Sequence, residues 1–469
     1  MPITEHINAL LRFEPVAPLV YTYPPRSAYR RDEAPPSIDD VWRKDFRQSG
    51  RELNLYIHIP FCRYRCGFCN LYTAIGGQSD LISEYTRAIV RQLYDSASII
   101  QSRKLRTINI GGGTPSLLSI SDYRQIFRAL TEIYPGWREI VDEVSTEAAP
   151  DTIGGPAGAG PAYLEELRRL GVTRVNLGIQ SLQDRELRQA GRAPANFKSV
   201  MNAVEIIKKV GIPNFSTDLI IGFAGQTDEA WDDSVERAIS FAPDTISTYL
   251  LTIRPDAWFE RTGLYASHGE SLLYRRYERA REALYAVGYV YDSNIRYKIP
   301  GRGGLLQKVL QFRGVPVLGI GAGARSYTNT ADYIVGGHNR PALSQISDYI
   351  TAVSEGSLLP ARGFIFDDNE RIRKRLALDL FDLHLDELAP YGFSGVRDSF
   401  TPVLVALVNA GLLQEAGADH YQLTRKGYEY RDVVSGLFFS DRVKERDRGF
   451  YEAIRAESGV KGNMAAVLG

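Results

Sequence analysis

The sequence predicts an α/β fold, in which a parallel sheet of six strand–helix units is followed by a smaller, mostly helical domain. Three observations lead to this prediction. Six short apolar, β-rich runs recur along the first part of the chain, and an amphipathic segment follows each run. Such alternation is typical of strands joined by covering helices. After about residue 340 the alternation stops and helical segments predominate.

The predicted strands and helices follow one another in a regular order. Gly171, Gly211 and Gly288 stand where helices should end, since glycine readily adopts the left-handed conformation that closes a helix. Right-handed crossovers would place all six strands in parallel, with the chemistry at their C-terminal ends. The predicted strands are 54–59, 107–110, 143–146, 174–179, 215–222 and 245–253, and the predicted helices are 81–100, 122–134, 163–170, 197–210, 228–241 and 272–287.

Three regions are expected along the chain. Residues 1–50 are rich in Pro, Arg and Tyr and have no clear period, so we expect an extended arm that is ordered against the sheet. Residues 51–340 hold the strand–helix units, and residues 341–469 form a mostly helical, winged-helix-like domain. The elements expected in this domain are helices at 369–388, 399–410 and 426–436, with a hairpin from 411–413 and 421–424.

Composition excludes several classes of protein. Lys plus Arg and Asp plus Glu both total 56, so no excess of positive charge indicates binding to nucleic acid or to an anionic membrane. No run of 18 apolar residues is present, and the first residues lack the pattern of a secretion signal. We therefore expect a cytoplasmic protein without membrane or nucleic-acid partners, and a monomer.

The three cysteines are the most informative residues. They all fall within one loop directly after the first predicted strand, as Cys62, Cys66 and Cys69 with C-x3-C-x2-C spacing. Three thiolates can hold three irons of a cubane [4Fe–4S] cluster and leave the fourth iron open, which is the mark of a catalytic metal site. S-adenosylmethionine (SAM) can occupy that position and yield a 5′-deoxyadenosyl radical. These cysteines are thus the expected metal ligands and the catalytic centre.

Two alternatives give the cysteines no radical chemistry. One is a zinc site of three cysteines completed by His58, and the other is three unrelated buried thiols. A zinc site usually pairs one Cys-x2-Cys unit with a second distant pair, and no fourth cysteine exists.

Several motifs together resemble the radical SAM superfamily and, within it, the oxygen-independent coproporphyrinogen III oxidase-like family. The resemblance covers nearly the whole chain and implies a partial (βα)6 radical SAM barrel. It also implies that residues 341–469 form a lid over the barrel mouth that helps to exclude water and oxygen. The segments that carry it are 21–24, 55–62, 112–115, 176–181, 218–222, 319–327 and 423–427.

The same resemblance implies which residues contact SAM. The glycine-rich loop, residues 111–115, would approach the amino group of SAM, as glycines allow. Glu147 would accept hydrogen bonds from the ribose of SAM, and Tyr56 would border SAM. A second SAM would contact Phe68, Gly113, Thr114, Gln180, Arg192 and Asp218. Thr252 stands where porphyrin-type enzymes carry a small apolar residue. The expected cofactor-binding residues are Tyr56, Phe68, Gly112, Gly113, Thr114, Glu147, Gln180, Arg192, Asp218, Thr252 and Arg325.

Three branches of the family remain possible. Porphyrinogen oxidases carry a fourth cysteine where this chain has Leu71, and heme chaperones carry a His-Asn-x-x-Tyr-Trp segment where this chain has residues 309–313. A third branch uses the second SAM to methylate or cyclopropanate an unsaturated carbon. We therefore predict a radical C-alkylating enzyme for an aromatic or polyene-like metabolite, with coproporphyrinogen oxidation and heme trafficking as the alternatives. Reduced flavodoxin or ferredoxin would supply electrons.

Sequence also offers candidates for holding an anionic group of the small-molecule substrate. These are Arg296, Lys298, Arg302 and Arg313.

Overall fold

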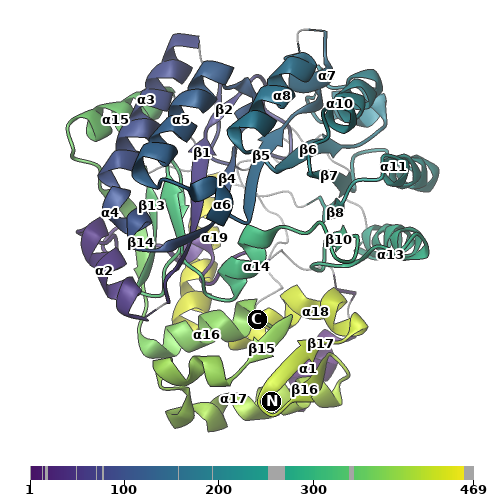
Figure 1. The fold of residues 1–469 in the computed structure, drawn as a ribbon. Coiled ribbons are helices and arrows are strands. Elements are labelled where there is room, and N and C mark those ends of the chain that lie inside the picture. The colour runs from purple at the N-terminus through teal and green to yellow at the C-terminus, as the bar shows by residue number, and fades with distance from the viewer. Residues whose placement is uncertain are drawn as a thin grey trace.

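A nine-stranded sheet forms the centre of the protein (Figure 1). This computed structural model describes the chain except for residues 1, 13, 16–19, 49, 70, 77–78, 157, 193, 252–269, 337–342 and 459–469. Its strand order is β11-β1-β4-β5-β6-β7-β8-β10-β9, and the strands from β11 to β8 are parallel. The bounds are β1 Glu52–Ile59, β4 Lys104–Gly112, β5 Glu143–Ala148, β6 Arg174–Gln180, β7 Asn214–Ile221, β8 Thr245–Leu250, β9 Val290–Tyr291, β10 Arg296–Lys298 and β11 Val317–Ile320.

All six predicted strands are present, and each lies beside the next one in the chain. The sheet is a partial barrel, since its first and last strands are not paired with each other. Two antiparallel strands, β9 and β10, extend the β8 edge, and β11 extends the β1 edge; the sequence had not predicted these three. The partial-barrel prediction is confirmed.

Helices cover the outer face of the sheet (Figure 1). Strand side chains such as Leu55, Ile57, Leu177 and Leu219 are fully buried. Burial of such apolar surface is the main favourable contribution to folding. The covering helices are α3 Ser79–Asp95, α5 Ile120–Ile133, α8 Gly160–Leu170, α10 Phe197–Val210, α11 Asp228–Ser240 and α13 Glu270–Ala286.

Local sequence explains where these helices begin and end. Asn196 accepts a hydrogen bond from the backbone N–H of Ser199, and the Ser199 hydroxyl accepts one from the N–H of Asn196, so α10 begins with a capping box. Gly171 and Gly211 follow α8 and α10 with φ of 111° and 68°, as their positions in the sequence predicted.

The C-terminal region contains helices and a three-stranded antiparallel sheet of order β15-β17-β16. A hairpin forms as β16 and β17, but its first strand lies later in the chain than the predicted residues 411–413. The predicted helix at 369–388 was wrong in its second half, because the chain leaves the helix after Leu378 to form β15 and a 3-10 helix. The elements are α16 Asp368–Leu378, β15 Asp382–His384, η3 Asp386–Tyr391, α17 Arg397–Asn409, β16 Leu413–Gly417, β17 His420–Leu423, α18 Arg425–Ser435 and α19 Asp441–Ser458.

A second small sheet that the sequence had not predicted lies beside the barrel, with strand order β12-β13-β14. Its strands are β12 Arg325–Ser326, β13 Ala331–Val335 and β14 Pro360–Ile365.

The N-terminal arm is not wholly extended, which corrects the prediction. It contains α1, Ile3–Leu10, and α2, Ile38–Gln48. Ile7 is buried in the core of the C-terminal region and Trp42 in that of the barrel, and such apolar side chains stabilise each short helix by tertiary packing. The arm therefore contacts both parts of the molecule.

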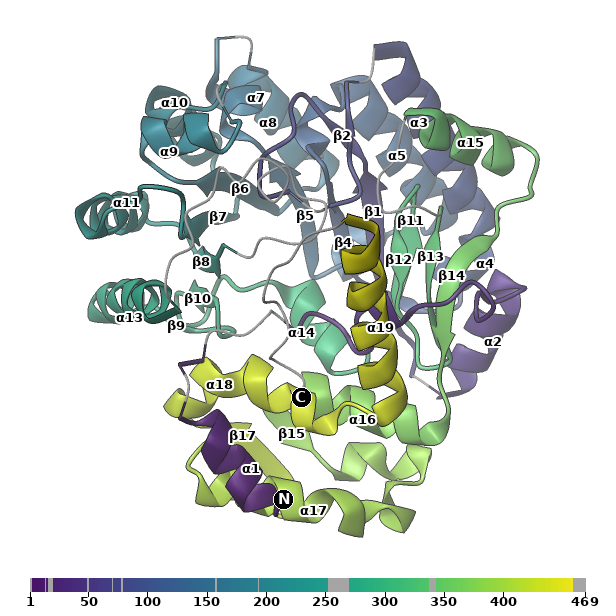
Figure 2. The ribbon, with the colours of Figure 1, turned by 180° about the vertical axis from the view of Figure 1, so that it is seen from behind.

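Helix α19 returns from the C-terminal region across the back of the molecule toward β1 (Figure 2).

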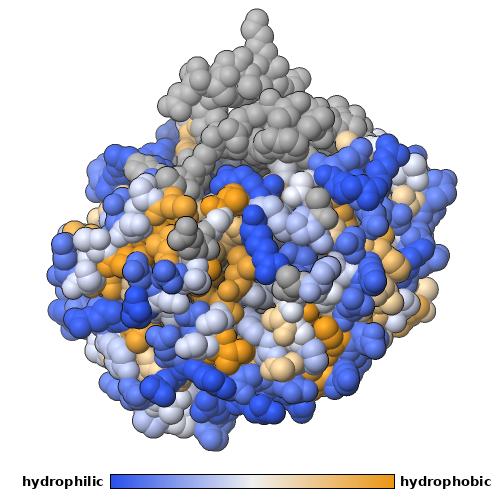
Figure 3. Space-filling model, turned by 90° about the horizontal axis from the view of Figure 1, so that it is seen from above, coloured by the Kyte–Doolittle hydropathy of each residue, from blue (hydrophilic) through white to orange (hydrophobic). Residues whose placement is uncertain are grey.

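Seen from above, apolar side chains gather toward the centre of one face and hydrophilic ones surround them (Figure 3). Among the described residues, no helix is both long enough and apolar enough to cross a membrane.

Candidate active site

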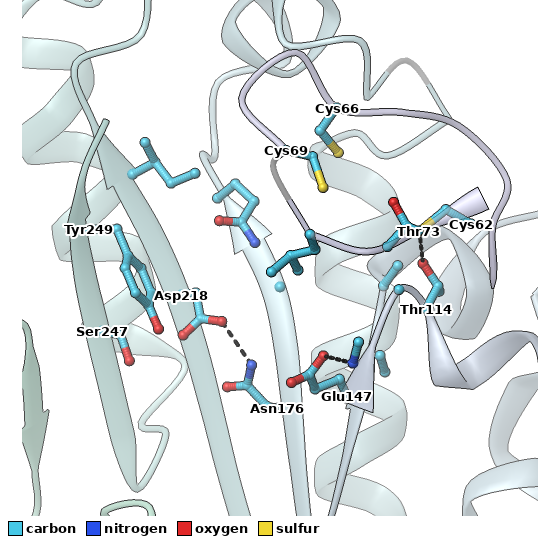
Figure 4. A pocket seen from close by; sticks show the side chains of 18 of the residues that line it. Cys62, Cys66, Cys69, Thr73, Thr114, Glu147, Asn176, Asp218, Ser247 and Tyr249 are labelled. Atoms are coloured by element: carbon cyan, nitrogen blue, oxygen red, sulfur yellow. Dashed lines mark hydrogen bonds between the residues drawn. The ribbon is translucent and has the colours of Figure 1, made fainter. Parts of the chain in front are cut away.

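A cavity of about 480 Å³ lies at the C-terminal ends of the barrel strands. The cysteine loop covers one side of it and strands β6 to β8 form the other side (Figure 4). The loop follows β1 directly, and the cavity is lined in addition by Tyr21 of the arm. Eleven of the fourteen predicted site residues line this cavity: Cys62, Cys66, Cys69, Phe68, Gly112, Gly113, Thr114, Glu147, Gln180, Arg192 and Asp218.

The cysteine loop is held by backbone hydrogen bonds. The N–H of Cys69 donates to the carbonyl of Cys66 at 3.0 Å, and the N–H of Gly67 donates to the carbonyl of Ala190 at 2.8 Å. Burial raises the pKa of Cys62 to about 12, although the Thr114 hydroxyl, 3.4 Å from its sulfur, lowers it. A bound metal would hold these half-buried thiols as thiolates, as coordinated thiols lose their protons.

His58 is already engaged within the protein. Its Nε2 lies 2.8 Å from the carbonyl of Tyr72 and its Nδ1 lies 2.9 Å from the Tyr56 hydroxyl. The zinc alternative with His58 therefore lacks a free fourth ligand.

The glycine-rich loop packs against the cysteine loop. The N–H groups of Gly113 and Thr114 donate to the carbonyls of Ile59 and Phe61, both at 2.8 Å. A Cβ on Gly113 would lie 2.5 Å from the Phe61 carbonyl and 3.0 Å from the sulfur of Cys62. No larger residue fits here without moving the backbone, so glycine is required by this close approach.

Glu147 lies on β5 beside the glycine-rich loop. Its Oε2 accepts a hydrogen bond from the N–H of Gly112 at 3.1 Å. Burial raises the pKa of Glu147 to about 7 and Asp218 adds to the rise, while the Gly112 bond opposes it. A carboxyl group in this position can accept hydrogen bonds from a pair of hydroxyls, which is the role predicted for it with the SAM ribose.

Polar side chains form a network on the opposite side of the cavity. The Nδ2 of Asn176 on β6 donates to Oδ2 of Asp218 on β7 at 2.8 Å, and the Ser216 hydroxyl donates to Oδ1 of Asn176 at 2.7 Å. Ser247 and Tyr249 on β8 complete this side (Figure 4). Burial raises the pKa of Asp218, and hydrogen bonds from Asn176 and Ser247 partly offset this.

Sequence reasoning missed Asn109, Asn176, Ser247 and Tyr249 as residues of the cavity. A usable signal was present, because side chains two residues apart in a strand point to the same face. On β6, Asn176 precedes the cavity residue Gln180 by four positions, and on β8, Ser247 precedes Tyr249 by two.

Arg192 and Gln180 connect the two sides. The Nη1 of Arg192 lies 3.2 Å from the sulfur of Cys66, and its Nη2 donates to the carbonyl of Gly178 at 2.8 Å. Its buried Nε has no partner within the described part of the chain. Gln180 has a φ of 71° at a register shift between β6 and β7, an unusual conformation for a residue other than glycine. A guanidinium so placed could bind a ligand carboxylate.

Three predicted residues do not line the cavity. Tyr56 is half-buried behind the glycine-rich loop, where its Cε2 would lie 3.2 Å from a Cβ on Gly111. Arg325 lies on β12, and the neighbouring hydroxyl of Tyr327 raises its pKa despite burial. Thr252 lies outside the described residues. Contacts of these residues with SAM stay predictions.

Comparisons with known proteins now place the chain. Residues 56–238 match the family described as the radical SAM superfamily. This part of the chain, which holds the three cysteines, is similar to the radical SAM superfamily. Its fold is that of coproporphyrinogen III oxidase from Escherichia coli, with a TM-score of 0.73, 20% identity and coverage of 92% of this chain and 98% of that one.

Sequence relatives of the chain include HemW proteins and a coproporphyrinogen oxidase. The heme chaperone HemW of Synechocystis is 33% identical and is matched over 58% of this chain and 65% of its own length. HemW of Escherichia coli is 26% identical over 83% and 98%. Oxygen-independent coproporphyrinogen III oxidase of Pseudomonas aeruginosa is 25% identical over 74% and 76%. These names favour the two alternative functions over C-alkylation.

Proposed function

We propose that this protein is an enzyme that cleaves SAM reductively at a [4Fe–4S] cluster on Cys62, Cys66 and Cys69 and modifies a small molecule in the same cavity. One observation carries the proposal: the three thiols, a glycine backbone and Glu147 face one cavity that continues to a second polar wall at Asp218.

The residues of the chain would divide the work between binding and orientation. A reduced [4Fe–4S] cluster bound here supplies the electron that breaks a C–S bond of SAM, which gives the 5′-deoxyadenosyl radical. Gly113 and Thr114 would let the amino group of SAM approach the cysteine loop, and Glu147 would hold the ribose. The loop and arm would exclude water, which protects a radical from side reactions. Flavodoxin or ferredoxin is the proposed electron donor.

The polar wall of Asn176, Asp218, Ser247 and Tyr249 would hold the second ligand. A buried carboxyl at Asp218 suits the ammonium group of a second SAM, since a cation near a carboxylate offsets its burial. In that arrangement the first SAM would give the radical and the second would give a methyl carbon. This supports C-alkylation of an unsaturated carbon as the first candidate reaction, together with Leu71 in place of a fourth cysteine.

Oxidative decarboxylation of a porphyrinogen is the second candidate. The name of the Pseudomonas aeruginosa relative favours it, and the fold match covers 92% of this chain. Leu71 lines the cavity with 49% of its surface exposed, so the position of the missing cysteine is accessible to substrate.

One assay tests the proposal and separates the candidates. Anaerobically reconstituted protein, reduced with dithionite, should convert SAM to 5′-deoxyadenosine, and a Cys66→Ser variant should not. SAM labelled in its methyl group should label the product if C-alkylation is correct, and coproporphyrinogen III should release CO2 if decarboxylation is correct. Stoichiometric heme binding without any 5′-deoxyadenosine would instead favour heme trafficking and overturn the proposal.

A further inference from the structure

Two of the chain's six histidines meet an aspartate on the C-terminal sheet, outside the SAM cavity. His384 at the end of β15 is the cross-strand partner of His420 at the start of β17. Asp382 lies two residues before His384, on the same face of the strand. Both strands lie in the lower part of Figure 1, away from the cysteine loop.

The three side chains converge on a single point. Nε2 of His420 lies 2.7 Å from Oδ1 of Asp382, and Nε2 of His384 lies 3.8 Å from the same oxygen. The two imidazole rings are stacked with centroids 3.9 Å apart and planes 16° apart. One ligand atom from each residue thus lies within 4.8 Å of the others.

These distances fit the coordination shell of one ion. Zinc bonds to nitrogen and oxygen of about 2.0–2.1 Å in tetrahedral geometry place neighbouring ligand atoms about 3.3 Å apart. The observed separations of 2.7 and 3.8 Å lie on either side of this value. Small side-chain rotations would bring the three ligand atoms to bonding distance from one ion.

Neighbouring groups fix the carboxylate as metal sites require. Nη2 of Arg313 donates to Oδ2 of Asp382 at 2.7 Å, and Nε2 of Gln422 donates to Oδ1 at 2.8 Å. Hydrogen bonds of this outer kind orient ligands and raise metal affinity. Arg313 follows helix α14, Leu306–Phe312, which packs against β1 and β4 of the barrel, so the carboxylate is anchored across the two parts of the molecule.

The site is open to solvent ions. The side chains of Asp382, His384 and His420 are 28%, 38% and 21% exposed. Asp382, Arg313 and Gln422 also line a groove of about 330 Å³ between the barrel and the C-terminal region. Water from this groove could supply a fourth ligand.

A simple histidine–aspartate hydrogen bond explains only part of this geometry. That bond uses one imidazole, His420, and one carboxylate oxygen. It gives no reason for a second imidazole to stack on the first and turn its own Nε2 toward the same oxygen. Two imidazoles and one carboxylate are a common donor set for divalent first-row metals.

We propose that Asp382, His384 and His420 form a binding site for a divalent transition-metal ion, with Zn²⁺ as the ion that the geometry fits. The ion would cross-link β15 to β17 and, through Asp382 and Arg313, hold the C-terminal region against α14. This proposal does not depend on the radical reaction.

Cobalt titration of the cluster-loaded protein tests it, because Co²⁺ reports its ligands by its absorption. We expect one Co²⁺ per chain with d–d bands of a nitrogen–oxygen site, displaced by Zn²⁺. His384→Ala and His420→Ala should each weaken binding more than the roughly 10–100-fold that loss of an outer partner costs. Arg313→Ala should weaken it within that range, and His6→Ala, on α1, should leave it unchanged.

Two results would overturn the site. The first is a Co²⁺ spectrum with thiolate charge-transfer bands only, which would place the ion at the cysteines. The second is binding that is the same in His384→Ala, His420→Ala and the parent protein, or absent in the parent. Metal-free variants should keep the melting temperature of the parent, which shows that a loss of binding is not a loss of folding. Zn²⁺ should raise the melting temperature only when both histidines are present.

Discussion

The two walls of the SAM cavity are built in different ways. The wall on the side of β1, β4 and β5 consists of sulfur atoms, glycine backbone and one carboxyl, and a Cβ on Gly113 would clash with backbone 2.5 Å away. The wall on the side of β6, β7 and β8 consists of polar side chains in a network around Asp218. Backbone walls tolerate little change, whereas side chains can be exchanged. The first wall therefore suits the close approach of one fixed reagent, the SAM at the cluster, and the second wall suits hydrogen bonding to a second ligand.

The largest effect is expected at the cysteine wall. Cys66→Ala should remove one iron ligand, and 5′-deoxyadenosine formation should fall to background, because the cluster would lose one of three protein ligands. Iron content and cleavage of SAM by the reduced protein measure this. Normal cleavage of SAM by this variant would show that Cys66 is not a required ligand of the cluster.

The second largest effect is expected from Gly113→Ala. The added methyl group must move the Phe61 carbonyl or the Cys62 sulfur. A displacement of about 1 Å can cost a reaction roughly 100-fold in rate, so SAM cleavage should fall by about that factor. The rate is measured by chromatography of 5′-deoxyadenosine. Gly395→Ala in the C-terminal region, where an added Cβ meets nothing within 4 Å, serves as the control. Equal rates in the two variants would contradict the close approach.

A moderate effect with a pH signature is expected from Glu147→Gln. Loss of charge-assisted hydrogen bonds to the ribose should weaken SAM binding roughly 10- to 100-fold. Burial raises the pKa of Glu147 to about 7, so SAM, which favours the ionised form, should bind more tightly as pH rises through 7 and then level off. Calorimetric titration from pH 6 to 8 measures this. The pH dependence should vanish in Glu147→Gln, and its persistence there would remove Glu147 as the cause.

The smallest effect on SAM cleavage is expected from Asp218→Asn. This change keeps the hydrogen-bond geometry with Asn176 in part and leaves the cysteine wall intact. Basal 5′-deoxyadenosine should stay within about threefold of the parent, while modified product falls at least tenfold, since buried charge pairs are worth more than about 1.5 kcal/mol. Quantifying 5′-deoxyadenosine and the modified product in parallel distinguishes the contributions of the two walls. Equal loss of both would show that Asp218 belongs to the SAM wall.

Sequence reasoning was most successful where a local pattern decides the structure. The apolar run in β1 and the glycines after α8 and α10 are such patterns, since burial and backbone conformation act at the residues themselves. It was less successful where pairing with a segment far along the chain decides the structure. Asp382–His384 had helical spacing with α16 but pairs with β17, which the local sequence cannot show.

The residues of the cavity show the same contrast between local patterns and distant pairing. Spacing predicted that the three cysteines act together, and the family motifs predicted Glu147 and Asp218 as site residues; all of these line the cavity. Asn176 and Tyr249 are single polar residues within strands, and only the curvature of the sheet brings them to one cavity. In the arm, Ile3, Ile7 and Leu10 have the spacing of the apolar face of α1, a signal that was present but not used.

The electron paramagnetic resonance spectrum of the reduced, reconstituted protein, with and without SAM, tests most directly whether the three cysteines hold a cluster that binds SAM. We expect about four irons per chain, a [4Fe–4S] signal that is absent in Cys66→Ala, and a change in that signal when SAM binds at the open iron. A protein that holds zinc, or a cluster signal that SAM leaves unaltered, would contradict this expectation.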